Sequence, residues 1–376
     1  MRKVLYLSGT RADFGLMRRT LKAIDADARL ALEVAVTGMH LLPDYGLTVN
    51  EIAANGFAIA GRIETPDSAG SARQMAVNIA RVIEGMGEII ARSRPDVLVL
   101  LGDRGEMLAG AIAATHEDVA IVHIHGGERS GTVDEPVRHA ISKLAHFHFT
   151  STQDARRRLI RMGEREDRVW VVGAPGLDGL SQDAVLPRAE LLASLRLEPA
   201  RPVALFVHHP VVQDADAMAR ETQAILAGLF QSGCQIVALA PNSDAGGKDM
   251  RAALQTVSSH PDFRLVTHFP RSQFVSWMAI ADLMIGNSSA GIIEAGSFGT
   301  PVVNVGSRQN LRERNPNVTD VAEADEALPG VIRAVLARGR LEPHNVYGDG
   351  AAAPRIAALL ASVPLDPEAL RKFNVY

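Results

Sequence analysis

Short apolar runs alternate with longer amphipathic stretches along almost the whole chain, and this alternation constrains the fold more than any other feature. The runs are apolar at nearly every position, which is typical of strands buried on both faces of a parallel sheet. Helices between such strands cover the two faces, so the pattern predicts an α/β protein. The expected strands are 3–8, 32–37, 96–101, 119–124, 147–150 and 169–172, followed by 203–207, 235–240, 263–266, 283–286 and 301–305. The clearest helical stretches are 71–92, 135–145, 215–231 and 272–281.

The chain length, 376 residues, suggests two domains at roughly 150 residues each. The pattern breaks at Gly173-Ala174-Pro175-Gly176. We therefore predict a Rossmann-like domain over 1–174, a second over 175–355, and a helical C-terminal segment within 356–376, over 365–373, that can return to the first domain. Two such domains facing a central cleft resemble the glycosyltransferase-B arrangement, in which substrate sits between the domains at the carboxyl ends of both sheets.

Charge and hydropathy exclude several classes of partner. With 39 basic and 43 acidic side chains, the net charge of −4 gives no electrostatic reason to expect nucleic acid or an anionic membrane as partner. The apolar run near the N-terminus is too short for a signal peptide, and no stretch of about eighteen apolar residues spans a membrane. The single cysteine, Cys234, lies beside an apolar run, so we expect a buried structural thiol in a reducing compartment. We expect a cytoplasmic protein.

The first candidate for a binding site is the turn Ser8-Gly9-Thr10-Arg11-Ala12-Asp13-Phe14-Gly15, directly after the first expected strand. Backbone N–H groups and the Arg11 guanidinium at such a strand-to-helix turn can bind phosphate. The alternative is a plain turn with a solvated arginine. The glycine spacing differs from the dinucleotide fingerprint, so NAD is not expected. His40 also follows an expected strand.

Carboxylates concentrate after two later strands. Asp103 follows the run 96–101, where it points into the expected cleft or, alternatively, caps the next helix. The segment 123–139 contains Glu128 and Asp134 as acid–base candidates, and Arg138 lies one helical turn after Asp134. Alternating histidines in this segment leave a metal site as a second possibility, but no ligand pattern supports it, so no metal is expected.

The second half contributes candidate anion-binding groups, each with a plainer alternative. His209 ends a strand, and Ser288 and Ser289 begin a helix whose free N–H groups attract anions. Glu294 is placed to accept hydrogen bonds from ribose hydroxyls. The alternatives are a strand-end histidine, an ordinary serine N-cap and solvated arginines. The arginines that can clamp a diphosphate are Arg308 and Arg312, with Arg314 nearby.

Taken together, these motifs resemble the hydrolysing UDP-N-acetylglucosamine 2-epimerases of sialic and legionaminic acid synthesis. The resemblance spans essentially the whole chain in order. It is carried by Gly9-Thr10-Arg11-Ala12-Asp13-Phe14-Gly15, Gly102-Asp103-Arg104, His123-Ile124-His125-Gly126-Gly127-Glu128, Asp134-Glu135, Arg138-His139-Ala140-Ile141-Ser142-Lys143, Asn287-Ser288-Ser289-Ala290-Gly291-Ile292-Ile293-Glu294-Ala295 and Gly306-Ser307-Arg308-Gln309.

The resemblance implies that UDP is eliminated from a UDP-N-acetylhexosamine and that water then adds to the 2-acetamidoglycal. The product is a free sugar inverted at C2, such as N-acetylmannosamine. It also implies that Asp103, Glu128 and Asp134 carry the proton transfers, that no cofactor is needed, and that the chain forms a homo-oligomer. With a sugar as substrate, we predict that His40 lines the sugar pocket. Gly105 departs from the bulkier residue expected there, so the substrate is either UDP-N-acetylglucosamine or a 2,4-diacetamido-trideoxy analogue. The rival functions are a non-hydrolysing 2-epimerase, a glycosyltransferase and a non-catalytic nucleotide-sugar sensor.

Overall fold

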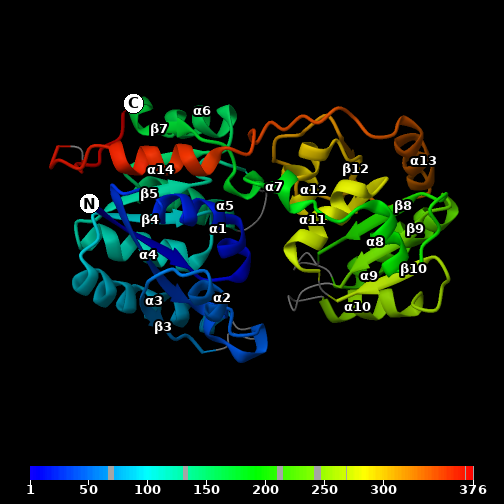
Figure 1. Cartoon of the computed structure of the whole chain (residues 1–376), viewed down its shortest axis with the longest axis horizontal. Coiled ribbons are helices and arrows are strands. Elements are labelled where there is room, and N and C mark those ends of the chain that lie inside the picture. The colour runs from blue at the N-terminus through cyan, green and yellow to red at the C-terminus, as the bar shows by residue number, and fades with distance from the viewer. Residues whose placement is uncertain are drawn as a thin grey trace. The chain divides into compact units, whose positions relative to one another are not determined.

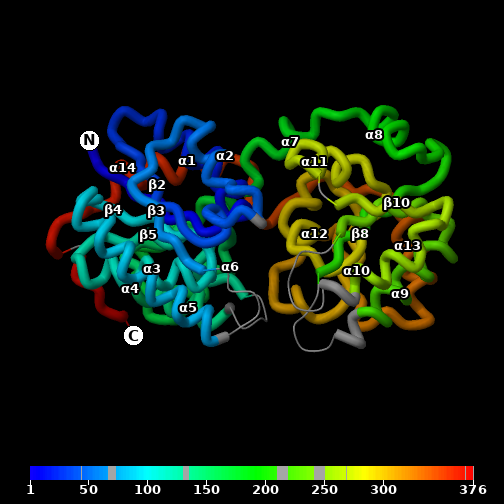
Figure 2. Tube along the Cα trace, turned by 90° about the horizontal axis from the view of Figure 1, so that it is seen from below, coloured from blue at the N-terminus to red at the C-terminus, as the bar shows by residue number. Residues whose placement is uncertain are grey.

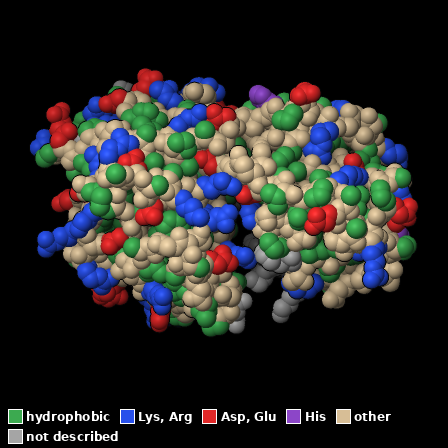
Figure 3. Space-filling view, in the orientation of Figure 1, with side chains coloured by type: hydrophobic (Ala, Val, Ile, Leu, Met, Phe, Trp, Pro, Cys, Tyr) green, Lys and Arg blue, Asp and Glu red, His purple; other side chains and the backbone are tan. Residues whose placement is uncertain are grey.

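The computed structural model describes residues 1–66, 72–129, 134–209, 215–240, 247–267, 269–368 and 370–375. The chain divides into unit 1, Met1–Asp178 with Tyr347–Tyr376, and unit 2, Gly179–Val346. Each unit is built on one parallel sheet with helices on both faces (Figure 1). Within the described parts of the chain, no helix combines the length and apolar character needed to cross a membrane. Basic and acidic side chains are interspersed over the face seen in Figure 3.

Unit 1 contains a seven-stranded parallel sheet in the order β3-β2-β1-β4-β5-β6-β7. Its strands are β1 (Arg2–Ser8), β2 (Leu30–Thr37), β3 (Ile59–Ile63), β4 (Val97–Leu101), β5 (Ala120–Ile124), β6 (Phe147–Thr150) and β7 (Val169–Val171). Its helices are α1 (Arg11–Asp25), α2 (Val49–Ala54), α3 (Ala72–Ser93), α4 (Gly105–His116), α5 (Asp134–Leu144), α6 (Gln153–Arg161) and α14 (Ala352–Ser362).

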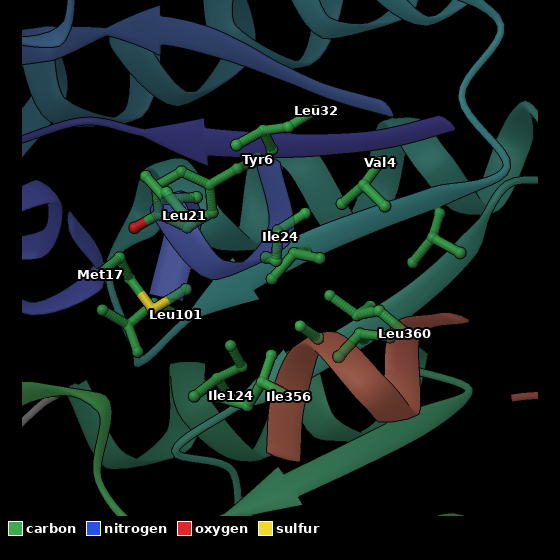
Figure 4. Close-up of a cluster of buried hydrophobic side chains, with 14 of the residues drawn as sticks. Val4, Tyr6, Met17, Leu21, Ile24, Leu32, Leu101, Ile124, Ile356 and Leu360 are labelled. Atoms are coloured by element: carbon green, nitrogen blue, oxygen red, sulfur yellow. The ribbon is translucent and has the colours of Figure 1, made fainter. Parts of the chain in front are cut away.

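The alternation of side chains along β1 divides the core of unit 1 between the two faces of the sheet. Val4 and Tyr6 pack with residues of α1, α2 and α14, and this cluster is drawn in Figure 4. Leu5 and Leu7 point the other way, into a cluster formed by α3, α4 and α5. Both faces are therefore covered, as the continuous apolar runs predict.

The chain returns to unit 1 at Tyr347, so the crossings lie at 178/179 and 346/347 rather than at 174 and 355. Asp178 fixes the return, because its carboxylate accepts hydrogen bonds from the backbone N–H groups of Ala352 and Ala353 at the start of α14. Helix α14 then packs against α1, and Figure 2 shows the two side by side.

The predicted C-terminal helix over 365–373 is wrong, because the described residues 365–368 and 370–375 form no helix. Within the tail, the N–H groups of Leu370 and Arg371 donate to Asp366 O and Glu368 O, at 3.1 and 3.2 Å, while other polar groups bond to the rest of unit 1. The Val375 N–H donates to Gly163 O (2.8 Å), and Leu370 O accepts from His146 Nε2 (3.1 Å). The helix of the C-terminal region is α14, which begins at Ala352.

Unit 2 contains a six-stranded parallel sheet in the order β10-β9-β8-β11-β12-β13. Buried clusters lie on both of its faces, one with residues of α9, α10 and α13 and one with residues of α8 and α11. Cys234 is fully buried there, which confirms the predicted structural thiol. The elements are α7 (Leu180–Asp183), α8 (Arg188–Ser194), β8 (Val203–Val207), α9 (Ala215–Gln231), β9 (Gln235–Leu239), α10 (Gly247–Thr256), β10 (Phe263–Val266), α11 (Arg271–Ile280), β11 (Leu283–Gly286), α12 (Ser289–Ile293), β12 (Val302–Val305), β13 (Val318–Val321) and α13 (Leu328–Arg338).

Candidate active site

The strand order of each sheet reverses at one point, and the candidate residues gather at these two points. In unit 1 the reversal lies between β1 and β4, and in unit 2 between β8 and β11. Open α/β sheets bind ligands at the carboxyl ends of the strands on either side of such a reversal. The turn 8–15 and Asp103 follow β1 and β4, while His209 and Ser288 follow β8 and β11.

The turn after β1 is organised by Asp13, a residue that the phosphate hypothesis did not use. Its buried carboxylate accepts hydrogen bonds from the N–H groups of Gly9 (3.0 Å) and Thr10 (2.7 Å), and from Ser8 Oγ. Burial raises the pKa of Asp13, while these hydrogen bonds act in the opposite direction. Arg11 lies at the surface with its side chain 52% exposed and its Nε 3.2 Å from Glu51 Oε1. Its contact with phosphate stays a prediction.

His40 lies behind this turn rather than at an open surface. Its Nε2 is 2.9 Å from Ser8 Oγ, and its Nδ1 is 2.7 Å from Thr48 Oγ1. Since Ser8 donates to Asp13, the consistent arrangement has Thr48 donating to Nδ1 and Nε2–H donating to Ser8. Burial lowers the pKa of His40 to about 4, so the ring is neutral at pH 7. In this structure His40 supports the turn, and its predicted sugar contact is not tested.

The predicted carboxylates Asp103 and Glu128 meet at Arg138, which reaches between them from α5. Arg138 is buried, and its Nη2 pairs with Asp103 Oδ2 while its Nη1 lies 3.4 Å from Glu128 Oε2. Nη1 also donates to His125 O (3.0 Å). The other oxygen of Glu128 accepts a hydrogen bond from Ser151 Oγ (2.6 Å). Two carboxylates therefore have fixed positions around one buried cation.

Asp134 is the third predicted carboxylate, and its side chain lies outside the described residues. Its backbone begins α5, four positions before Arg138. The sequence pattern pairs these two residues on one helix face. The described partners of Arg138 are instead Asp103 and Glu128, so the catalytic role of Asp134 stays a prediction.

The backbone between β5 and Glu128 takes conformations that side chains rarely adopt. His125 has a φ of +64°, and Gly127 has a φ of +76° with so little room that a Cβ would lie 2.4 Å from Ala155 O. Strain of this kind persists where the surrounding structure imposes it, commonly at functional sites. His125 places Nδ1 3.0 Å from Glu128 Oε1, and its buried Nε2 has no hydrogen-bond partner among the described residues. These contacts make His125 a functional candidate, whereas the sequence pattern offered it only as one of the alternating histidines of a possible metal site.

His123, considered above as a metal ligand, is buried with both ring nitrogens engaged. Nε2 donates to Gly102 O (2.7 Å), and Nδ1 lies 3.0 Å from Ser142 Oγ. Burial lowers its pKa to about 3, which keeps the ring neutral. His123 thus ties the residue before Asp103 to the helix that carries Arg138.

A cavity of about 280 Å³ lies beside Asp103 in unit 1. Its polar wall includes Arg104 and Glu106, which form an ion pair with Arg104 Nη2 3.2 Å from Glu106 Oε1. Glu106 fits against glycines at the ends of β1 and β2, because a Cβ on Gly9 would lie 3.2 Å from Glu106 Oε1 and one on Gly38 3.5 Å away. Glu106 is not among the site residues that the sequence pattern predicted.

In unit 2, Asn287 ties together the ends of β8 and β11. Its Oδ1 accepts from the His209 N–H (2.7 Å), and its Nδ2 donates to His209 O (2.8 Å). Arg308 Nη1 and Gln309 Nε2 both donate to Asn287 O, at 3.0 and 3.1 Å. Burial, followed by the nearby Arg308 charge, lowers the pKa of His209 to about 4. The structure thus brings His209 and Arg308 together through a residue quoted only as part of a motif.

The serines that follow Asn287 lie at the start of α12, and Glu294 follows the last residue of that helix. Ser288 Oγ accepts from the Ala290 N–H (3.4 Å), the N-cap expected as the alternative, and Ser289 is the first residue of α12. Glu294 pairs with Arg271 Nη1 (2.8 Å), a partner that was not expected.

The loop after β12 holds the remaining predicted arginines. The Arg312 N–H donates to Gln309 O (3.1 Å) within that loop, and Arg314 pairs with Asp320 (2.9 Å). The predicted ribose and diphosphate contacts in unit 2 are not tested by this geometry. The polar segment 241–246 that follows β9 lies outside the described residues.

Comparison with known proteins places this geometry in a family. A family model described as UDP-N-acetylglucosamine 2-epimerase matches residues 22–361. A Legionella pneumophila protein named UDP-N,N'-diacetylbacillosamine 2-epimerase (hydrolyzing) is 46% identical over 376 residues, covering 100% of both chains. A Campylobacter jejuni protein named GDP/UDP-N,N'-diacetylbacillosamine 2-epimerase (hydrolyzing) is 31% identical over 333 residues, 87% of this chain and 86% of its own.

The fold also has a close match among solved structures. The crystal structure of UDP-GlcNAc 2-epimerase from Neisseria meningitidis bound to UDP-GlcNAc has a TM-score of 0.81 and 18% identity, and the match covers 95% of this chain and 99% of that one. At this identity the likeness concerns the fold, and it confirms the prediction of two α/β domains with parallel sheets. The family model and the full-length relative agree with the motifs described above. The chain therefore belongs to the UDP-N-acetylglucosamine 2-epimerase family.

Proposed function

We propose UDP-N,N'-diacetylbacillosamine as the substrate of this hydrolysing 2-epimerase, with UDP and the free C2-inverted sugar as products. The Legionella relative that carries this substrate in its name supports the proposal, because it is 46% identical along the whole chain. The description of the family names UDP-N-acetylglucosamine, which is therefore the second candidate substrate. The observation that carries the chemistry is the buried cluster in which Arg138 holds Asp103 and Glu128.

The proposed reaction has two steps whose sum consumes one water. A carboxylate removes the proton from C2 while the C1–O bond to UDP breaks, which leaves a 2-acetamidoglycal. Water then adds its hydroxyl to C1, and a proton returns to C2 on the opposite face. General acid–base groups of this kind contribute about a hundredfold to ten-thousandfold each. Asp103, Glu128 and Asp134 are the proposed carriers, and Arg138 positions the first two.

Unit 2 is proposed to hold the nucleotide. Arg308 offers a guanidinium beside the ends of β8 and β11, and a guanidinium binds a diphosphate with two parallel hydrogen bonds. Such cations also stabilise the charge that develops on the departing UDP. His209, Ser288, Ser289 and Arg312 are proposed phosphate contacts, with Glu294 on the ribose.

The decisive test is to incubate the enzyme with each candidate UDP-sugar and measure UDP and free sugar by mass spectrometry. We expect UDP release with UDP-N,N'-diacetylbacillosamine and, in D₂O, one deuterium at C2 of the product. Failure to release UDP would reject the hydrolysing reaction, and release from UDP-N-acetylglucosamine alone would reject the proposed substrate.

Glu128→Gln is expected to lose turnover by about a hundredfold or more while still binding UDP. Glu166→Gln is the matched control, because that carboxylate is 71% exposed.

The same substrate assignment supports a role in the synthesis of legionaminic or a related sialic acid. With UDP-N-acetylglucosamine as substrate, the free sugar is N-acetylmannosamine. We also propose that the protein forms a homo-oligomer. Its molar mass, measured by light scattering as it elutes from a size-exclusion column, tests this proposal directly. A monomer at micromolar concentration would contradict that proposal.

A further inference from the structure

We propose that Gly105 and Ile79 determine which sugar this enzyme accepts, because together they set the depth of the cavity beside Asp103. In this inference the cavity receives the 4-acetamido and 6-methyl groups of a 2,4-diacetamido-2,4,6-trideoxy sugar. The inference rests on the proposed function and adds to it the residues that choose the substrate. It starts from the lining of the cavity, which lies wholly within unit 1.

The lining of the cavity combines apolar side chains with the polar side chains of Thr65, Asn78, Asp103, Arg104 and Glu106. A hexosamine with hydroxyls at C4 and C6 brings polar groups that the apolar part of this lining leaves without partners, and this is costly for a binding site. A trideoxy sugar with an acetamido group at C4 instead brings two methyl groups to the same region. Met75, at the rim, has 59% of its surface exposed, so a ligand methyl group would remove apolar surface from water. The apolar lining side chains are Met39, Leu42, Tyr45, Pro66, Met75, Ile79 and Val82.

The polar part of the lining suits an amide. Arg104 and Glu106 lie side by side as an ion pair, with Nη2 3.2 Å from Oε1. An acetamido group has one N–H, which a carboxylate accepts, and one carbonyl, to which a guanidinium donates. Its methyl group then faces the apolar wall. Asp103 lines the same cavity, so carbons beyond C2 extend into it when Asp103 acts at C2.

Gly105 and Ile79 are in direct contact across the cavity wall. A Cβ built on Gly105 would lie 2.8 Å from Ile79 Cδ1 and 3.1 Å from Cγ1. A side chain at position 105 must therefore displace Ile79, whose other side packs against the core formed by α3 and α4. The space available to a displaced Ile79 side chain is the cavity, which would then become shallower. Gly105 lies in the first turn of α4 and is not among the residues with positive φ, so alanine is tolerated by the backbone and acts through Ile79 alone.

The experiment compares kcat/KM for UDP-N,N'-diacetylbacillosamine and for UDP-N-acetylglucosamine. We expect Gly105→Ala to lower the value for the diacetamido substrate about tenfold, the effect of roughly one methyl group in an apolar pocket, and to change the other substrate by less. Ile79→Val removes the carbon that a Cβ at position 105 would strike, so the double variant G105A/I79V should recover most of the loss. Val77→Ala is the control, because Val77 is on the same helix, 40% exposed, and outside the cavity lining.

Some results would overturn this inference, and one would refute the proposed function instead. An equal loss for both substrates in Gly105→Ala, or no recovery in the double variant, overturns the inference. If Gly105→Ala does not fold, Ile79→Ala provides the second test, since a deeper cavity should improve turnover of a 4-propanamido analogue relative to the 4-acetamido sugar. An unchanged ratio in Ile79→Ala also overturns the inference. If the unmodified enzyme turns over neither of the two UDP-sugars, the proposed function itself is refuted.

Discussion

Glu164 joins the C-terminal tail to helix α5, and we expect its replacement by glutamine to lower the free energy of unfolding of unit 1 by about 3 kcal/mol. The side chain is 4% exposed, and it lies among three basic groups. Lys143 Nζ is 2.7 Å from Oε1, while His148 Nε2 is 3.0 Å from Oε2. Lys372, from the tail, pairs with the same Oε2.

The magnitude follows from the pKa of Glu164. Burial by itself raises this pKa, but the hydrogen bonds that His148, Lys143 and Lys372 donate to the carboxylate outweigh it and lower the pKa from 4.5 to about 2. Each pKa unit corresponds to about 1.4 kcal/mol, so the ionised carboxylate stabilises the folded state by about 3 kcal/mol. Because the folded pKa is the lower one, this stabilisation is complete above pH 4.5 and is lost as the pH falls from 4.5 towards 2.

Unit 1 can be followed separately in the full-length protein, because the two tryptophans are divided between the units. Trp170 is in β7 and Trp277 in α11, so Trp277→Phe leaves a reporter in unit 1 alone. Urea unfolding of the Trp277→Phe protein, with and without Glu164→Gln, gives the difference in the free energy of unfolding at pH 8, 6 and 4. Glu166→Gln is the control, since its pair with Arg156 is exposed and should contribute less than about 1 kcal/mol.

The expected difference is constant between pH 8 and 5 and shrinks below pH 4.5. A loss smaller than about 1 kcal/mol at pH 8 would mean that desolvation cancels the three contacts. A difference that increases on acidification would have the wrong sign for a carboxylate with a lowered pKa. Either result refutes the reasoning.

Three further predictions concern the site itself. Arg138→Met leaves the buried carboxylate of Glu128 and the partly buried carboxylate of Asp103 without their cation, so urea unfolding should show a loss of about 3–5 kcal/mol. Arg308→Gln should raise the Kd for UDP at least about tenfold and weaken its salt dependence, as calorimetric titration measures. His209→Gln should leave the salt dependence between pH 6 and 8 unchanged, because a pKa of about 4, lowered by burial and by Arg308, keeps the ring uncharged there.

Matched variants make these predictions refutable. Arg138→Lys keeps the charge but lacks the bidentate guanidinium. Its free energy of unfolding should therefore lie between those of the wild type and Arg138→Met. Equal stability of Arg138→Met and the wild type would show that the cluster contributes nothing. An unchanged salt slope in Arg308→Gln would place the diphosphate elsewhere, and Arg220→Gln, a surface change outside the site, controls for net charge.

The central strands were predictable because burial on both faces makes them apolar at every position. β4 and β8 are examples, with all five residues buried in each. The edge strands β3 and β13 were missed for the same physical reason. Each has a neighbour on one side only and contains exposed polar residues, Arg62 in β3 and Asp320 in β13, so neither gives a continuous apolar run.

The candidate carboxylates were predictable as types and positions, but their partners were not. Asp103 and Glu128 follow neighbouring strands whose register pairs Leu101 with Ile124, and register depends on the assembled sheet. The helical spacing of Asp134 and Arg138 is a local feature, so it was visible in the sequence. The ion pairs of Arg138 span 10 and 35 residues, and no local pattern reveals contacts of that kind.

Helix α5 connects the stability of the tail with the geometry of the carboxylates. Near its start, Arg138 holds Asp103 and Glu128. At its other end, Lys372 Nζ donates to Ser142 O and Ala145 O, where a cation also interacts favourably with the helix dipole. The tail therefore anchors the helix that positions the site, although it lies more than 200 residues away in sequence. The described residues of the tail form no helix, yet Lys372 provides hydrogen-bond donors for carbonyl groups at the end of α5.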